Sequence, residues 1–181
     1  MLIRSKNMIF AAGTLFSLGF LALGEGKPAM AVGVGESFPS IETTHVSTSK
    51  TGPVEVAGKV TLINFWATWC ESCKVELKEM ESEFKPLFDD QDFQVKFVSL
   101  DKEPGKATQW FKANLTAGSE MFDRLFADPD FKAADVVGVD AFPMTVLIDK
   151  NGKISHIQRG FKPGEHQTAE LVRIATGLLK K

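Results

Sequence analysis

The sequence predicts one α/β domain in which a mixed central sheet is flanked by helices on both faces. The first observation behind this is an apolar run, Val60–Trp66, followed by an amphipathic helical pattern and then a second strand-like run. That order is typical of a parallel βαβ unit. The second observation is a pair of strand-like runs, Met144–Ile148 and 153–159, joined by a short polar turn. This pair predicts an antiparallel hairpin that completes the sheet.

The first elements follow in chain order from residue 32. Residues 32–59 are polar and rich in glycine and proline, which predicts a loose region with one or two short edge strands. Val60–Trp66 is apolar and partly β-branched, as expected of a strand buried on both faces. A helix should begin near Ser72 and should kink or end at Pro86. Its apolar face is formed by Leu77, Met80, Phe84 and Leu87.

The second half of the chain supplies the remaining elements. Residues 93–100 predict a second strand, and Pro104–Asn114 predicts a short helix with proline at its start. Residues 121–134 are expected to be helical or irregular, because an Asp-Pro-Asp sequence interrupts their pattern. After the hairpin, residues 164–180 predict a closing amphipathic helix.

Residues 1–31 are typical of a secretory signal peptide. Arg4 and Lys6 precede an apolar stretch, and a small-residue sequence ends at Ala31. The apolar stretch is shorter than the about 20 residues that a membrane-spanning helix needs. We expect cleavage after Ala31, with an uncleaved membrane anchor as the alternative. Either form exports the domain of residues 32–181 to the periplasm or to the outer face of the cytoplasmic membrane.

Composition limits the partners of this domain. The formal net charge of the whole chain is −2, and no stretch is rich in lysine and arginine. Residues 1–31 carry more basic than acidic side chains, so the domain without them is more acidic still. Nucleic acid is therefore not an expected partner. The remaining length suits one ordinary domain, which we expect to be a monomer.

The two cysteines of the chain, Cys70 and Cys73, stand two residues apart. A disulfide that closes so small a loop stabilises a fold little, so a purely structural role is not favoured. A zinc site would need further ligands, and the three histidines have no ligand spacing, so we expect no metal. The spacing favours reversible dithiol chemistry, which needs no cofactor.

The position of the motif assigns roles to the two thiols. Cys70 stands at the expected start of a helix, where unpaired N–H groups and the helix dipole favour a thiolate. Cys70 should therefore be the more exposed and acidic thiol, and the nucleophile. Cys73 lies one turn along the helix and should be the more buried, resolving thiol.

Two glutamates tune this chemistry in our interpretation. A carboxylate on Glu71 would oppose the Cys70 thiolate and make the dithiol a better reductant, unless it is merely a solvated side chain. Glu76 lies three residues past Cys73 and could take its proton if burial raises the carboxyl pKa. The alternative is an exposed glutamate on the helix surface. Asn64 in the buried strand cannot accept a proton, which favours the role for Glu76.

Residues 64–73 (NFWATWCESC) and 142–152 (FPMTVLIDKNG) resemble the thioredoxin superfamily, and more closely its exported TlpA/ResA-like branch. The resemblance implies a thioredoxin-like fold and a thiol–disulfide oxidoreductase that acts as a reductase. It also implies a disulfide-bearing protein substrate, which is oxidised apocytochrome c for ResA-like members. Electrons would come from a membrane thiol-transfer protein.

The resemblance also implies which residues meet the substrate. Pro143 would be a cis-proline that packs against the active-site disulfide, and the peptide around Phe142 would bond to an extended substrate segment. The full set of expected substrate-binding residues is Trp69, Glu71, Phe142, Pro143 and Met144. Two positions depart from the family pattern. Ser72 replaces a common proline, and Met144 replaces a threonine or serine, which would make the groove more apolar.

Two other functions stay open from the sequence. The same fold could act as an oxidase or isomerase, which a reduction potential above about −180 mV would favour. A groove around Phe142 and Met144 could instead bind unfolded proteins as a chaperone module, with the thiols secondary.

Overall fold

The computed structural model describes residues 31–116 and 121–181 of the chain. Apart from its last residue, the segment predicted to be a signal peptide or anchor lies outside the described residues. Within those two ranges, none of the helices has the length and apolar character needed to cross a bilayer.

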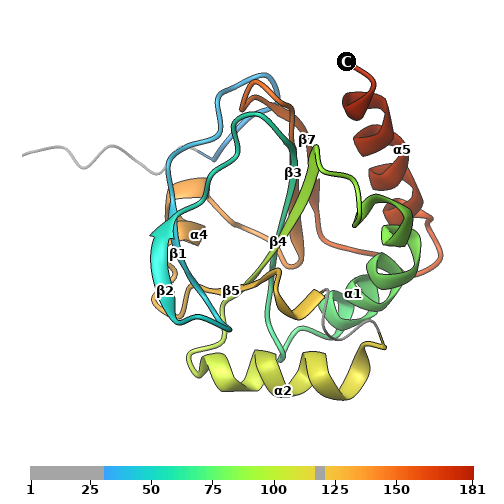
Figure 1. The fold of residues 1–181 in the computed structure, drawn as a ribbon. Helices are drawn as coiled ribbons and strands as arrows, with labels where there is room; N and C mark the ends of the chain where they lie inside the picture. The colour runs from blue at the N-terminus through green and yellow to red at the C-terminus, as the bar shows by residue number, and fades with distance from the viewer. Residues whose placement is uncertain (1–30, 117–120) are drawn as a thin grey trace, which may run out of the picture.

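Seven strands form one sheet in the order β2-β1-β5-β4-β3-β6-β7 (Figure 1). The strands are β1 Glu42–His45, β2 Lys50–Pro53, β3 Val60–Trp66, β4 Phe93–Ser99, β5 Leu125–Ala127, β6 Met144–Ile148 and β7 Ile154–Arg159. The helices are α1 Glu71–Glu83, α2 Pro104–Asn114, α4 Lys132–Val137 and α5 Gln167–Leu179, with a 3-10 turn η1 at Lys85–Leu87.

Strand β3, which leads into the two cysteines, lies inside the sheet. It pairs in parallel with β4 and antiparallel with β6, and β6 pairs antiparallel with β7. The predicted βαβ unit and the predicted hairpin are both confirmed. All seven residues of β3 are buried, because packed layers cover both faces of the sheet.

Two apolar clusters lie on opposite faces of the sheet. One contains side chains of α1, α2 and α5, and the other contains side chains of α4 and of the N-terminal segment. Neighbouring residues of β3 alternate between them: Leu62 belongs to the first cluster and Ile63 to the second. Figure 1 shows α1 and α5 together on one side of the sheet and α4 on the other. The predicted mixed sheet with helices on both faces is therefore confirmed.

Residues 121–134 differ from their prediction. They contain strand β5 and the first residues of α4. β5 is only three residues long, too short to show a period of two in the sequence. Its strand geometry comes from its neighbours, since it pairs in parallel with β4 and antiparallel with β1. The prediction at Pro86 is confirmed, because α1 ends at Glu83 and the proline lies in η1.

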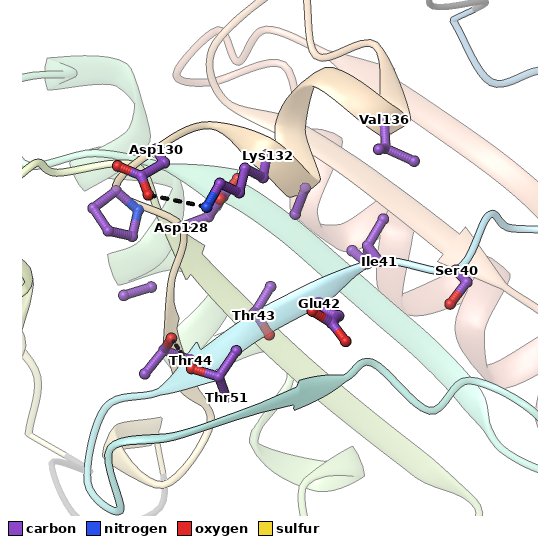
Figure 2. Close-up of a pocket in the computed structure, with 13 residues that line it drawn as sticks. Ser40, Ile41, Glu42, Thr43, Thr44, Thr51, Asp128, Asp130, Lys132 and Val136 are labelled. Carbon is purple, nitrogen blue, oxygen red and sulfur yellow. Dashed lines mark hydrogen bonds and ion pairs between the residues drawn. The ribbon is translucent and has the colours of Figure 1, made fainter.

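A cavity of about 400 Å³ lies between β1 and α4 (Figure 2). Asp128, Asp130 and Lys132, three of its charged lining residues, are already engaged with neighbours. Asp130 pairs with Lys132 at 3.3 Å, and the Asp128 carboxylate accepts a hydrogen bond from the Ala134 backbone N–H at 2.9 Å. The cavity shares no lining residue with the cysteine motif, so we do not place the functional site there.

Candidate active site

The two cysteines are joined by a disulfide where β3 leads into α1. Cys70 is the N-cap residue of α1, and its sulfur accepts a hydrogen bond from the Cys73 backbone N–H at 3.2 Å. Cys70 is 8% exposed and Cys73 is completely buried. Of the two sulfurs, that of Cys70 is therefore the one a partner can reach, and it sits where unpaired helix N–H groups favour negative charge.

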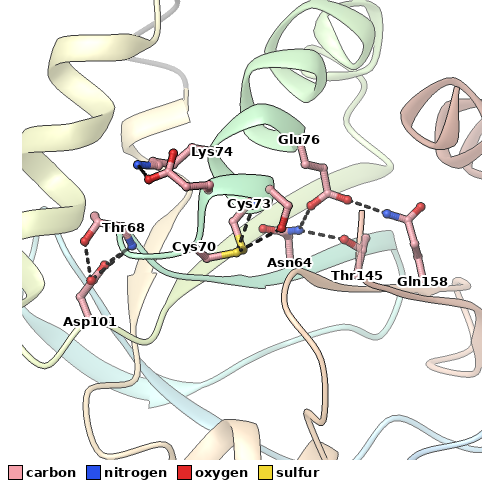
Figure 3. The surroundings of a disulfide bond; sticks show 11 residues. Asn64, Thr68, Cys70, Cys73, Lys74, Glu76, Asp101, Thr145 and Gln158 are labelled. Carbon is pink, nitrogen blue, oxygen red and sulfur yellow. Dashed lines mark hydrogen bonds and ion pairs between the residues drawn. A yellow bond between two sulfur atoms is a disulfide. The ribbon is translucent and has the colours of Figure 1, made fainter. Parts of the chain in front are cut away.

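A buried carboxyl group lies one turn further along α1 (Figure 3). Glu76 is completely buried, and each of its oxygens accepts a hydrogen bond from an amide. Asn64 Nδ2 donates to one oxygen at 2.7 Å, and Gln158 Nε2 donates to the other at 2.6 Å. Asn64 Nδ2 also donates to the Thr145 hydroxyl at 2.8 Å. The exposed helix-surface position considered for Glu76 is wrong.

The three polar partners of Glu76 form one row across the sheet. Asn64 on β3 lies opposite Thr145 on β6, which lies opposite Gln158 on β7. A polar row on the buried face of a sheet is costly unless its groups are hydrogen-bonded. Here the Glu76 carboxyl group of α1 supplies the acceptors for this row, so the position of that carboxyl group is fixed by three strands and one helix.

Burial raises the pKa of Glu76 to about 8. The hydrogen bonds from Asn64, Gln158 and Thr145 lower this pKa, and the nearby Glu79 charge raises it, but loss of solvation is the largest effect. The raised pKa predicted for Glu76 is confirmed. With the disulfide intact, the carboxyl group therefore holds its proton over most of the population at neutral pH.

A second buried carboxylate lies on the other side of the disulfide (Figure 3). Asp101 is 2% exposed and follows β4. It accepts hydrogen bonds from the Thr68 backbone N–H at 3.0 Å, the Thr68 hydroxyl at 2.6 Å and the Ser99 hydroxyl at 2.8 Å. These contacts tie the loop that precedes Cys70 to the end of β4.

Only some of the predicted substrate-binding residues lie together in the structure. Trp69 is 58% exposed, and its ring meets the ring of Phe142 edge-on at 5.3 Å. The Phe142–Pro143 peptide bond is cis, as predicted. Met144, however, is completely buried in the cluster beneath α4. The prediction that its side chain makes the groove more apolar is wrong, because β6 begins there and turns this side chain into the core.

Glu71 lies at the surface with 85% of its side chain exposed, and it pairs with Lys74 at 2.6 Å. Its charge is therefore both solvated and compensated, which favours the simpler of the two interpretations given for it. The Ser72 hydroxyl, where the family commonly has proline, lies 3.5 Å from the Cys70 sulfur.

Sequence reasoning did not identify Thr145, Gln158 or Asp101 as members of the site. The available signal was a polar residue inside each of two predicted strands, at Thr145 and Gln158. A search for buried polar positions facing α1 would have found that pair. Asp101 follows a predicted strand, where loop acids are common, and gave no separate signal.

The dithiol at a helix start, the buried carboxyl group one turn along that helix and the cis Phe142–Pro143 bond are typical of a thiol–disulfide oxidoreductase with a thioredoxin-like fold. The Redoxin family model matches residues 33–172, and the chain belongs to that family. It is 31% identical over 133 residues to the thiol-disulfide oxidoreductase ResA of Geobacillus thermodenitrificans, covering 72% of this chain and 71% of that relative. The redox-active CxxC pair and the ResA-like identity are thereby confirmed.

Solved structures agree with this assignment. The exposed lipoprotein thioredoxin Etrx1 from Streptococcus pneumoniae is similar with a TM-score of 0.57 and 25% identity, over 77% of this chain and 100% of that one. A thiol:disulfide interchange protein from Bacteroides sp. has a TM-score of 0.65 at 18% identity, over 84% of this chain and 93% of that one. The latter supports the fold alone.

Proposed function

We propose that this oxidoreductase works as a reductase of disulfides in partner proteins, with Cys70 as nucleophile, Cys73 as resolving thiol and Glu76 as the group that exchanges a proton with Cys73. The observation that carries this proposal is the buried Glu76 carboxyl group, held by two amides one turn beyond Cys73. A group with a pKa near 8 is well matched to a thiol as a proton partner.

The reaction proceeds in two exchange steps. The Cys70 thiolate attacks one sulfur of the partner disulfide, which forms a mixed disulfide and releases the first partner thiolate. Cys73 then gives its proton to Glu76 and attacks the Cys70 sulfur, which releases the second partner thiolate and restores the Cys70–Cys73 disulfide. Two electrons pass to the partner, whose thiolates take protons from solvent.

The proton that Glu76 takes from Cys73 stays within the site through the cycle. After the second step Glu76 is protonated, which agrees with its pKa of about 8 next to the intact disulfide. When an electron donor reduces the disulfide again, Glu76 returns this proton to Cys73. The site thus stores the proton that the resolving thiol loses and regains.

The surroundings of Cys70 support the reducing direction. Its sulfur contacts the Cys73 N–H and, at 3.5 Å, the Ser72 hydroxyl. In the part of the chain that the structure describes, no lysine, arginine or histidine is hydrogen-bonded to either sulfur. A strongly oxidising pair owes its potential to a stabilised reduced form, and a thiolate that has helix N–H donors but no cationic partner is stabilised less, which favours the reductant. The oxidase or isomerase alternative therefore has less support.

The partners follow from the family resemblance. We infer an exported protein, with residues 1–31 as signal peptide or anchor, that acts as a monomer in the periplasm or at the outer face of the cytoplasmic membrane. Its substrate would be oxidised apocytochrome c, and its electrons would come from a membrane thiol-transfer protein. Trp69, Phe142 and Pro143 would contact the partner chain. The burial of Met144 removes one of the two side chains on which the chaperone alternative depended.

Two measurements test the proposal. The wild type should catalyse insulin reduction by dithiothreitol, Cys70→Ser should be inactive, and Cys73→Ser should accumulate the mixed disulfide. Glu76→Gln should slow release of that mixed disulfide at neutral pH by about 10²-fold or more, because a positioned proton acceptor is lost. Glu83→Gln, the same change at the exposed end of α1, is the control.

An inert wild type would refute the reductase. A reduction potential above about −180 mV would support the isomerase instead. An unchanged pH–rate profile in Glu76→Gln would remove Glu76 from the mechanism.

A further inference from the structure

A cavity of about 390 Å³ lies beside Trp69. It includes Thr68 and Asp101, which lie across the disulfide from Glu76 in Figure 3. Trp69 and Phe131 provide its aromatic surface and Leu100 adds a buried apolar contact. Because Trp69 immediately precedes Cys70, any chain bound covalently to the Cys70 sulfur passes within reach of this cavity.

The walls of the cavity are held by buried contacts. Asp101 binds both the backbone N–H and the hydroxyl of Thr68, which fixes the residue before Trp69. On the opposite wall, Phe131 has a φ of 60°. A large side chain rarely adopts this left-handed conformation, and such strained residues concentrate at functional sites. The Asp128 carboxylate holds the same turn by accepting from the Ala134 N–H at 2.9 Å.

One positive charge at the rim is available to a partner. Glu103 and Lys106 pair with each other at 3.0 Å, and Asp101 is occupied by its hydrogen-bond donors. Lys102 is exposed and, within residues 31–116 and 121–181, has no ion pair or side-chain hydrogen bond. The cavity therefore presents an apolar interior with one uncompensated ammonium group at its edge.

We propose that this cavity, the Trp69 subsite, binds a large apolar side chain of the partner polypeptide next to its reacting cysteine, with a partner carboxylate against Lys102. The inference rests on the proposed reductase function. The volume is at the low end for small-molecule pockets, which suits one side chain better than a cofactor. Binding there gives the enzyme a preference among disulfides that the edge-on contact of Trp69 with Phe142 does not supply.

Four cyclic peptides with one disulfide test the proposal. They differ at two positions beside the attacked cysteine. One position is Phe or Gly, and the other is Glu or Lys. The measured quantity is the second-order rate constant with which the pre-reduced protein reduces each peptide. The wild type should prefer Phe over Gly by about tenfold, as partial burial of an aromatic ring allows. It should prefer Glu over Lys by about two- to fivefold, the range of an exposed ion pair.

Two variants separate the contributions. Phe131→Gly removes one wall while suiting the positive φ, so the Phe preference should disappear without disturbing the backbone. Lys102→Glu should invert the preference between Glu and Lys peptides. Lys85→Glu, an equal charge change on η1, is the matched control and should leave both preferences as in the wild type.

The outcomes distinguish the subsite from the function. A wild type that reduces insulin but treats all four peptides alike overturns the subsite and leaves the reductase intact. Preferences that survive in both Phe131→Gly and Lys102→Glu overturn it as well. A wild type that reduces neither insulin nor any peptide overturns the reductase, and the subsite with it.

Discussion

Two buried carboxyl groups flank the same disulfide, and they are held in different ways. Each oxygen of Glu76 accepts a hydrogen bond from one side-chain amide, and loss of solvation is the largest influence on its pKa. Asp101 receives a backbone N–H and two hydroxyl groups, and all of these donors belong to the segments that it joins. The first group lies one turn from Cys73, and the second is hydrogen-bonded to Thr68 in the loop that leads to Cys70.

The difference shows that burial alone does not determine what a carboxyl group does. Asp101 connects two strand ends and fixes the conformation of Thr68, which is a structural task that a charged acceptor performs well. Glu76 links α1 to the sheet, but it does so through Asn64, Thr145 and Gln158, which are already neighbours within the sheet. A polar row that is maintained on a buried face for one carboxyl group points to chemistry at that group.

The largest expected effect is on how stability depends on pH. The folded-state pKa of Glu76 is about 8 against an ordinary value of 4.5, so between these values the folded protein holds a proton that the unfolded chain releases. The free energy of unfolding should therefore fall as pH rises through this window, by about 1.4 kcal/mol per unit and on the order of 5 kcal/mol in total. Urea unfolding of the oxidised protein from pH 4 to 9 measures this.

Glu76→Gln should remove that slope, although altered hydrogen bonds with the two amides shift its curve as a whole. Asp101→Asn serves as the comparison on the other side of the disulfide and should keep the slope of the wild type. Parallel curves for wild type and Glu76→Gln would show that Glu76 does not hold the proton.

The next effect concerns Asp101, whose carboxylate links the loop before Cys70 to the end of β4. Asp101→Ala removes three hydrogen bonds and leaves the Thr68 N–H without its acceptor, which should cost about 2–4 kcal/mol in the free energy of unfolding. Denaturant unfolding at a single pH is sufficient to measure it. Asp130→Ala, which removes only a surface ion pair, should change stability by under about 1 kcal/mol. Equal losses of unfolding free energy in the two variants would contradict this structural role for Asp101.

The smallest expected effect distinguishes how hydrogen bonding from an amide and how burial each change the pKa of Glu76. Gln158→Met keeps the size of the side chain but removes the donor to one carboxylate oxygen. Because that bond favours the charged form, the pKa of Glu76 should rise further, by about 1–2 units for a bond to a charged group. The midpoint of the pH–rate profile for mixed-disulfide release should move upward accordingly. The exposed Gln109→Met is the control, and a profile that does not move would remove Gln158 from the site.

The elements with continuous signals were predictable from the sequence. β3, α2 and β6 have the bounds that the apolar runs and the proline positions predicted. The positions and relative exposure predicted for Cys70 and Cys73 are confirmed, because a helix start is readable from local sequence. β5 was not predictable, since a three-residue strand is defined by pairing with β1 and β4 rather than by its own pattern.

The site was predictable only where it is local. Glu76 lies on the same helix as the cysteines, so its spacing indicated its position. Its partner Gln158 is 82 residues away, and Asp101 is 33 residues from Thr68, so both depend on strand pairing that one sequence does not reveal. Met144 was misjudged for the same reason, because the register with β3 determines which face its side chain takes.

One end of the sheet has a consequence for association with other molecules. β2 forms that edge, and its four residues include Lys50, Gly52 and Pro53, with most of the strand exposed. Lysine and proline on a short edge strand obstruct pairing with a further strand, since one brings charge and the other lacks an N–H donor. The sheet therefore stops at β2, and strands of other copies of this protein are hindered from pairing with that edge even at high protein concentration.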